Sequence, residues 1–337
     1  MTSRPTCTRS VVLARRPDGN PVPEDFSLIE EALPALNDGE LLLVNEFVSL
    51  DAGFRNWMDE DSGDAVLPAM ALGAPVMGLV LGTVLESRHR DFEPGTRLMA
   101  RLAWQEHTVT DATDFLIRLP EPLEADAEHY LGILGDTGLS AFFGLRDIGR
   151  PKDGETVLVS AAAGAVGSIA GQLARIMGAR AVGISSGPEK LERLKRDLGY
   201  DAVIDRRKPL PDQLASACPE GVDVYFDNVG GPMLETVIDH LAEGARVVLC
   251  GAVSTYGQAA EGPKNLFQLV TRQAAMSGFL THTRAEEYPE ARAELARWLK
   301  EGKLVAPEHR LQGIEQVAQA FCDLFAGRNF GKTLVEL

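Results

Sequence analysis

The sequence predicts an α/β protein in which a doubly wound parallel sheet is inserted into a partly open β-barrel. The chain has 337 residues, enough for two ordinary domains. From about residue 124, strand-like and helix-like segments alternate, which is typical of βαβ units and a parallel sheet covered on both faces. Short apolar runs and turns flank this part. We therefore expect residues 1–124 and 293–337 to form the β-rich domain, and residues 125–292 to form the inserted domain.

Short strands make up the first predicted domain. Its first ~120 residues hold no long amphipathic helix. Turn residues at Pro17–Pro21 and Asn37–Gly39 separate the apolar runs. Runs of this length between turns predict a small β-barrel. The runs are Ser10–Leu13, Glu40–Val48, Val76–Val84 and Arg97–Ala103.

The inserted domain reads as strands and helices in turn. Thr156–Ser160 is a continuous apolar strand, and Val166–Met177 carries its apolar residues on one helical face. Further predicted strands are Ala181–Ile184, Ala202–Ile204, Val222–Phe226 and Arg246–Cys250, with helices at Glu189–Leu198 and Met233–Leu241. Beyond them we expect helices at Pro289–Glu301 and Ile314–Phe325 and strands at Leu304–Ala306 and Thr333–Val335.

The charge of the chain limits its partners. It carries 49 acidic and 33 basic residues, a net charge of -16. Such a chain repels nucleic-acid backbones and anionic lipid surfaces, so we expect a small-molecule partner instead. Residues 65–85 are uncharged, but their prolines and glycines would break a membrane helix, and we expect a loop followed by a strand at Val76–Leu85.

Cysteine and histidine spacing argues against a metal site. The four cysteines are scattered and form no Cys-x-x-Cys pair, and the six histidines have no partner at ligand spacing. Scattered cysteines, and the lack of an apolar leader in Met1–Ser10, predict a reducing, cytoplasmic location. The cysteines are Cys7, Cys218, Cys250 and Cys322.

A glycine-containing turn gives the strongest functional signal. Val157–Gly167 reads as a strand, a turn of small residues and a helix start. Gly164 and Gly167 fill the second and third positions of G-x-G-x-x-G, and Ala162 replaces the first glycine. The second glycine permits close approach of a pyrophosphate, and the third permits tight packing of helix on strand. We expect a dinucleotide to bind here; the alternative is a tight turn without a ligand.

The next strand end indicates which dinucleotide. An NAD enzyme places a carboxylate about 20 residues further on, where it binds the ribose hydroxyls. Here Ser185 and Ser186 follow the predicted strand, Lys190 lies on the next helix, and Arg206 and Arg207 follow the third strand. Hydroxyls and cations suit a 2′-phosphate, so we expect NADP(H). The alternative for Lys190 is an ordinary solvated charge on a helix.

Two other strand ends should face the nicotinamide half of the cofactor. Asp227–Gly231 and Cys250–Ala252 each follow an apolar strand. Ligands of open α/β sheets bind outside the carboxyl ends of the strands. The alternative is that these glycines only turn the chain. We expect Cys250 to be a buried small side chain rather than a nucleophile.

Several segments together resemble a known group. The chain resembles the zinc-independent branch of the medium-chain dehydrogenase/reductase superfamily, and within it the prostaglandin reductase, alkenal double-bond reductase and curcumin reductase group. The likeness spans nearly the whole chain. The segments that carry it are Asp136–Leu145, Ala161–Ser168, Phe226–Gly231, Cys250–Tyr256 and Asn329–Thr333.

The resemblance implies a GroES-like barrel, a Rossmann domain that binds NADPH, and catalysis between the two. It implies hydride transfer to the β-carbon of an enone or enal, and a homodimer. Pyrophosphate contacts are implied for Gly164, Ala165, Val166 and Gly167, and 2′-phosphate contacts for Ser186 and Lys190. Arg206 stands where the group commonly has a tyrosine. The remaining implied cofactor residues are Asn228, Cys250, Gly251, Ser254, Tyr256, Phe279, Leu280 and Asn329.

One position departs from the group. The group often has Asp-Pro-Tyr-Met-Arg in its first domain, with the tyrosine near the substrate. Here the stretch is Asp51–Arg55, and Gly53 replaces the tyrosine. Phe54, Trp57 or Trp104 are then candidates to shape the substrate pocket; the alternative is that they pack the core.

Tyr256 is the predicted catalytic residue. Hydride addition places negative charge on the carbonyl oxygen, and a phenol with an ordinary pKa near ~10 remains a hydrogen-bond donor at neutral pH. The alternative is that Tyr256 only packs its loop. Two other functions stay open: a quinone or carbonyl reductase on the same scaffold, and a non-catalytic NADPH-binding sensor.

Overall fold

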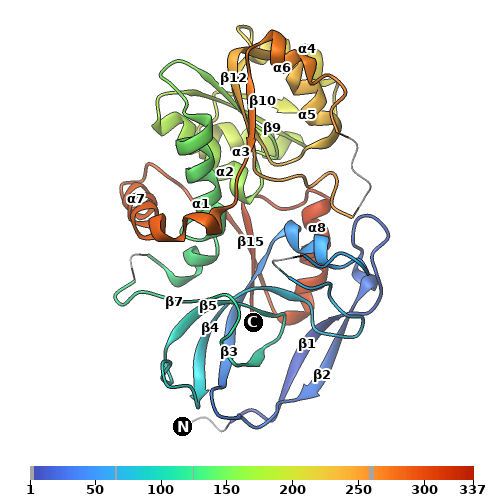
Figure 1. Ribbon diagram of the computed structural model, residues 1–337, viewed down its shortest axis with the longest axis vertical. Coiled ribbons are helices and arrows are strands. Elements are labelled where there is room, and N and C mark those ends of the chain that lie inside the picture. Colours follow the sequence, from blue (N-terminus) through green and yellow to red (C-terminus); the bar gives the residue numbers. More distant parts are fainter. Residues whose placement is uncertain (1–3, 65–66, 124, 258–261) are drawn as a thin grey trace. The chain divides into compact units, whose positions relative to one another are not determined.

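The computed structural model describes residues 4–64, 67–123, 125–257 and 262–337 (Figure 1). Met1–Ser3, the start of the uncharged stretch at residues 65–66, and residue 124, where we place the first domain boundary, lie outside the described residues. The chain divides into two compact units: Met1–Leu131, His309–Arg328 and Thr333–Leu337 in the first, and Gly132–Glu308 and Asn329–Lys332 in the second.

A six-stranded parallel sheet forms the centre of the second unit, with strand order β10-β9-β8-β11-β12-β13. Its strands are β8 (Thr156–Val159), β9 (Arg180–Ser185), β10 (Ala202–Asp205), β11 (Val222–Asp227), β12 (Leu241–Leu249) and β13 (Ala275–Gly278). The helices are α1 (Asp136–Phe143), α2 (Ala165–Ile176), α3 (Pro188–Leu198), α4 (Leu210–Ala217), α5 (Gly231–Ile238), α6 (Phe267–Thr271) and α7 (Tyr288–Lys300). The α/β class predicted from the alternating segments is confirmed.

The central strands are continuous apolar runs because both faces of the sheet are covered. Leu158, Val182, Tyr225 and Val247 come from four neighbouring strands and lie in one buried cluster. The site depends on this arrangement, since parallel strands end at the same edge of the sheet.

Tyr200 fixes the position of α2. Its hydroxyl donates to the Gly167 carbonyl at 2.6 Å, inside the core. A Cβ at Gly171 would lie 2.0 Å from the Tyr200 ring, so glycine is required where the helix passes over it. The hydrogen bond from Tyr200 thereby fixes the first turn of α2.

The first unit contains a two-stranded antiparallel sheet and a seven-stranded sheet. The smaller sheet pairs β1 (Cys7–Leu13) with β2 (Phe26–Ala32). The larger has the order β14-β15-β3-β4-β5-β7, with β6 paired to β3. Its strands are β3 (Leu41–Leu50), β4 (Met77–Ser87), β5 (Arg97–Ala103), β6 (His107–Thr110), β7 (Leu116–Arg118), β14 (Glu308–Gln312) and β15 (Lys332–Glu336). The helix α8 (Val317–Phe325) also belongs to the first unit.

Some sequence-based predictions were wrong or incomplete. Leu304–Ala306 is not a strand; the strand in this region is β14, four residues later. The sequence-based predictions did not include the helices α1, α4 and α6 or the strands β2, β6, β7 and β13. The predicted boundary between residues 292 and 293 falls inside α7, which belongs wholly to the second unit. No helix within the described ranges is long and apolar enough to span a bilayer.

Candidate functional site

The turn between β8 and α2 is shaped by its small residues. Ala161 has φ 47°, in the left-handed region, and its carbonyl accepts the Gly164 N–H at 2.8 Å. A Cβ at Gly167 would lie 2.3 Å from that carbonyl, so only glycine lets α2 start this close to the strand. A Cβ at Gly164 would meet Ala161 alone within 4 Å, so the space beside the turn is open.

This open space lies at the N-terminus of α2. Gly164 is the N-cap, and Ala165, Val166 and Gly167 begin the helix. The first N–H groups of an α-helix have no intrahelical partner, and the helix dipole adds positive potential there. The turn therefore fits a pyrophosphate in its geometry and its polarity.

The end of the chain returns to the same turn. Gly331 donates its N–H to the Ala163 carbonyl at 2.8 Å and forms a parallel bridge with Gly164. Its φ is 78°, and a Cβ would lie 1.9 Å from the Pro307 carbonyl, so this position requires glycine. The Asn329 amide donates to the Gly331 carbonyl at 3.1 Å. The return segment, Asn329–Lys332, thus borders the glycine turn.

Lys190 lies half-buried on α3, just beyond the end of β9. Burial first, and then the neighbouring charges of Arg206 and Arg193, lower the pKa of its ammonium to about 8, while Glu189 acts in the opposite direction. An anion that binds among these cations would stabilise the charged form of the Lys190 ammonium. Ser186 lies at the same strand end, where no carboxylate occurs.

Arg206 and Arg207 differ in their surroundings. Arg207 pairs with Asp205 at 2.7 Å, and the Arg207 guanidinium lowers the pKa of that carboxyl to about 2. Arg206 is exposed, and its backbone N–H donates to the Ser185 carbonyl at 2.8 Å. Arg206 is therefore the arginine of this pair whose charge is open to a ligand.

A buried carboxylate joins the neighbouring strand ends. Asp227 ends β11 with 0% of its surface exposed. Its Oδ1 accepts the hydroxyls of Ser160 at 2.9 Å and Tyr225 at 2.8 Å. It also accepts the backbone N–H groups of Val229 and Gly230, at 2.9 and 3.1 Å. The loop after β11 is thus pulled onto the end of β8.

The loop after β12 is tied to the same place. The Asp227 carbonyl accepts the N–H groups of Cys250 and Gly251, at 2.9 and 3.1 Å. The Ser254 hydroxyl donates to the Val229 carbonyl at 2.6 Å. The Asn228 amide donates to the Ser160 carbonyl at 2.8 Å. Asn228, Gly251 and Ser254 are therefore fixed relative to one another by hydrogen bonds.

The Tyr256 phenol folds back over this loop. Its oxygen accepts the Ala252 N–H at 3.3 Å, and burial raises its pKa. Within the part of the chain that the structure describes, no acceptor takes its proton, so the hydroxyl remains a donor at neutral pH. Burial also raises the pKa of the Cys250 thiol well above its usual range, which makes Cys250 a poor nucleophile.

The second unit brings its predicted site residues to one edge. Except for Asn329 on the return segment, they follow the carboxyl ends of the six strands of the sheet, β8 to β13. Phe279 and Leu280 follow β13; a Cβ at Gly144 would lie 3.1 Å from the Phe279 ring, and Leu280 is exposed. The edge thus holds the glycine turn, the cations and the Tyr256 phenol.

The predicted substrate residues belong to the first unit. Gly53, Phe54 and Trp57 lie on a short 3-10 helix, Ala52–Trp57, and the rings of Phe54 and Trp57 are 5.6 Å apart. A Cβ at Gly53 would meet nothing within 4 Å. Trp104 is fully buried against Phe321, with ring centroids 5.2 Å apart, which agrees with the core-packing alternative.

Arg55 is fully buried on the same 3-10 helix, which the sequence analysis did not predict. Its guanidinium donates to the carbonyls of Pro17 and Gly19, at 3.2 and 3.0 Å, and pairs with Asp59 at 2.9 Å. Arg55 thus fixes the loop at Pro17–Pro21, for which the sequence predicts only a turn. A buried arginine cannot be recognised from residue type alone, because arginine is usually exposed.

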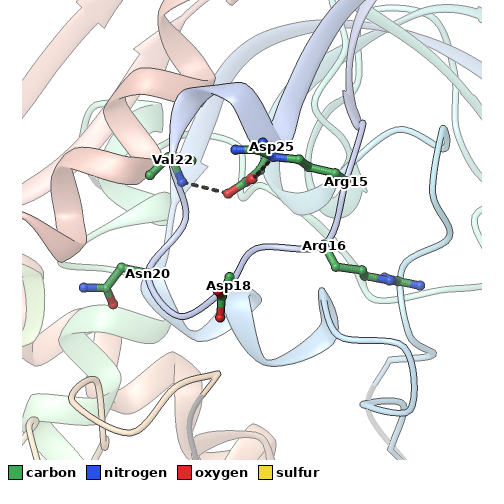
Figure 2. A pocket seen from close by; sticks show the side chains of 6 residues that line it. All are labelled: Arg15, Arg16, Asp18, Asn20, Val22 and Asp25. Atoms are coloured by element: carbon green, nitrogen blue, oxygen red, sulfur yellow. Dashed lines mark hydrogen bonds and ion pairs between the residues drawn. The ribbon is translucent and has the colours of Figure 1, made fainter.

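A hollow of about 260 Å³ lies on the first unit (Figure 2). Asp25 accepts hydrogen bonds from Arg15 at 2.6 Å and from the Val22 N–H at 2.8 Å. Arg16 donates to the Met58 carbonyl at 2.7 Å. These groups partner one another or the backbone, so we assign the hollow a structural role. Its lining residues are Arg15, Arg16, Asp18, Asn20, Val22 and Asp25.

The described residues do not fit a zinc site. Among them, no three His, Cys, Asp or Glu side chains lie together as metal ligands would. A zinc site of an alcohol-dehydrogenase type needs at least three such ligands.

The fold and the site together define a protein of the two-unit oxidoreductase class. A family model described as the N-terminal domain of oxidoreductase matches residues 9–117, and one described as zinc-binding dehydrogenase matches residues 165–297. NADPH-dependent curcumin reductase of Escherichia coli is 35% identical over 98% of this chain and 96% of its own. Prostaglandin reductase 1 of mouse is 37% identical over 97% and 98%.

A solved structure agrees with these relatives. CurA of Vibrio vulnificus in complex with NADPH superimposes with a TM-score of 0.89, at 36% identity, over 97% of this chain and 98% of that one. The chain therefore belongs to the medium-chain dehydrogenase/reductase superfamily, in the group of the curcumin, prostaglandin and alkenal reductases. The resemblance stated from the sequence is confirmed.

The Asp227 network predicts a large stability effect. Asp227→Ala leaves two hydroxyls and two N–H groups without their acceptor. Orphaned buried donors cost roughly 1–3 kcal/mol each, so we expect the free energy of unfolding in urea to fall by about 3 kcal/mol or more. Tyr225→Phe removes one donor only and should cost about 1 kcal/mol. Asp212→Asn, on α4, is the control. A loss for Asp227→Ala no larger than that for Tyr225→Phe would contradict the role of Asp227.

Proposed function

We propose that this protein is an NADPH-dependent ene reductase. It reduces the C=C bond of α,β-unsaturated ketones or aldehydes, without zinc. The observation that carries the proposal is the carboxyl edge of the second unit, where an open glycine turn, a cation cluster and a phenol donor lie on neighbouring strand ends. The names of the relatives support the same chemistry.

The phosphates of the cofactor have two places to bind. The N-terminus of α2, with Gly164, Ala165, Val166 and Gly167, suits the pyrophosphate. Ser186, Lys190 and Arg206 suit the 2′-phosphate, because a hydroxyl and two cations complement a dianion. The absence of a carboxylate at the end of β9 disfavours NAD, whose ribose hydroxyls would have no acceptor there.

Residues at the strand ends that Asp227 holds together would hold the nicotinamide half. The residues that we assign to it are Asn228, Cys250, Gly251, Ser254, Tyr256, Phe279, Leu280 and Asn329. Bound NADPH supplies the hydride that adds to the β-carbon of the substrate. Tyr256 keeps its proton because burial raises its pKa, and its O–H donates to the carbonyl oxygen as negative charge develops there. Solvent protonates the α-carbon.

We propose the chemical class of the substrate and the cellular location. An α,β-unsaturated carbonyl compound is the small-molecule partner. Gly53, Phe54 and Trp57 stay a prediction for its pocket, whereas the burial of Trp104 favours core packing. The free thiols of all four cysteines support a reducing cytoplasm.

The function is tested by following NADPH oxidation with a panel of enals, enones, quinones and saturated aldehydes. We expect oxidation with enals or enones, and saturated carbonyl products. Activity confined to quinones would favour a quinone reductase. Tight NADPH binding without turnover on any member would favour a non-catalytic sensor.

Tyr256→Phe should lower turnover on the best enone by several-fold to about a hundredfold, the loss typical of one donor, with NADPH affinity unchanged. Tyr288→Phe is the matched control.

The pKa of Lys190 predicts a pH dependence for NADPH binding. Below pH 8 the ammonium is already charged, whereas above pH 8 binding must take up a proton. The dissociation constant of NADPH should therefore stay level between pH 7 and 8 and then rise by up to about tenfold per pH unit. That of NADH should not change. Lys190→Ala should weaken NADPH about ten- to a hundredfold and remove the rise, whereas Lys195→Ala should do neither.

We also propose a homodimer through the edge strand β13. This strand ends the sheet, and α6 presents Phe267 with 73% and Val270 with 66% of their surfaces exposed. The outer edge of an edge strand, near exposed apolar side chains, is typical of a surface that a second copy covers. Ultracentrifugation should give twice the chain mass of 36.4 kDa. Val270→Glu should give monomers, but Leu72→Glu, an exposed leucine of the first unit, should not. A monomeric wild type would contradict this.

A further inference from the structure

One cation beside the proposed 2′-phosphate site has no role so far. Arg193 lies on α3, one helical turn after Lys190, so the two side chains share a face of the helix. The chain as a whole has a net charge of -16, yet positive charges gather here. Like charges one turn apart destabilise a helix unless an anion compensates them.

Phe330 holds the Arg193 side chain in one orientation. The guanidinium carbon lies 3.7 Å from the centroid of the Phe330 ring. The Arg193 Nε donates to Asp197 at 3.2 Å, one turn further along α3. Within the described ranges, the two terminal nitrogens of Arg193 have no acceptor. The guanidinium is thus fixed by its flat face and by Nε, and its outer N–H groups remain for a ligand.

The phenylalanine beneath it is itself anchored to the phosphate turn. Phe330 is buried in the return segment, Asn329–Lys332, whose Gly331 bonds the Ala163 carbonyl. The Phe330 ring under Arg193 is therefore linked to the glycine turn through the backbone of Gly331.

Charged groups from two elements act on Lys190. Glu189 and Arg193 face it from its own helix, and Arg206 faces it from the segment after β10. Ser185 and Ser186, at the end of β9, bring hydroxyls but no charge. Lys190, Arg193 and Arg206 thus bring three positive charges to this place, and a phosphate dianion would offset their mutual repulsion.

We propose that Arg193, oriented by Phe330, is a third cation of the 2′-phosphate site and contributes to the choice of NADPH over NADH. The proposal rests on the proposed function, since it requires that NADPH binds at this edge. It adds a specificity residue that residue type alone did not reveal.

Arg193→Gln removes the charge, and fluorescence titration with NADPH and NADH measures the result. We expect about a tenfold or larger rise in the dissociation constant of NADPH, as for one lost charged hydrogen bond, and less than about a twofold change for NADH. Adenosine 2′,5′-bisphosphate should follow NADPH, and AMP should follow NADH. Arg193→Lys should recover part of the affinity. Arg196→Gln, on the same helix, is the matched control.

The pH profile gives a second readout that a structural role would not move. Loss of the Arg193 charge should raise the pKa of Lys190, so the alkaline weakening of NADPH binding should begin at a higher pH in Arg193→Gln. Phe330→Leu keeps an apolar side chain but removes the ring, and should weaken NADPH more than NADH. Equal binding of NADPH by wild type and Arg193→Gln, or equal losses for both cofactors, would overturn the proposal.

These outcomes are separate from failure of the proposed function. A wild-type protein that binds NADH as tightly as NADPH would overturn the function itself. A wild type that prefers NADPH, with an Arg193→Gln variant that prefers it equally, would overturn only the role of Arg193.

Discussion

The Asp227 carboxylate is the interaction on which the candidate site depends. A carboxylate without exposure is costly unless donors surround it, and here two hydroxyls and two N–H groups do so. Its own backbone carbonyl accepts two further N–H groups from the loop after β12. One residue therefore ties the ends of β8, β11 and β12 together. The position of the Tyr256 loop follows from that tie.

Glycine and charge then divide the edge into two parts. At the α2 end the backbone supplies the polarity, because Gly164 and Gly167 keep side chains out of the turn. At the α3 end side chains supply it, with Lys190, Arg193 and Arg206 in an otherwise acidic chain. The return segment borders the first part and, through Phe330, supports the second.

Local patterns explain why much of the fold was predictable. Strands that are buried on both faces are apolar runs, so β8, β11 and the end of β12, Arg246–Leu249, could be identified from the sequence. The segment at residues 304–306 is apolar for another reason: it packs without pairing, and the Gln172 side chain takes both backbone bonds of Val305, at 2.8 Å each. A strand and an apolar loop have the same sequence pattern when a distant side chain supplies the loop's backbone hydrogen bonds.

The sequence by itself determined the α/β class, the glycine turn and the residue types at the strand ends, because these depend on neighbours along the chain. The tertiary structure decided which groups became special. Arg55 is buried and Arg193 lies on an aromatic ring because segments far apart in the sequence meet there. Lys190 titrates near pH 8 because folding buries it and brings Arg206 beside it. Burial and long-range charge are properties of the folded chain, and no local pattern records them.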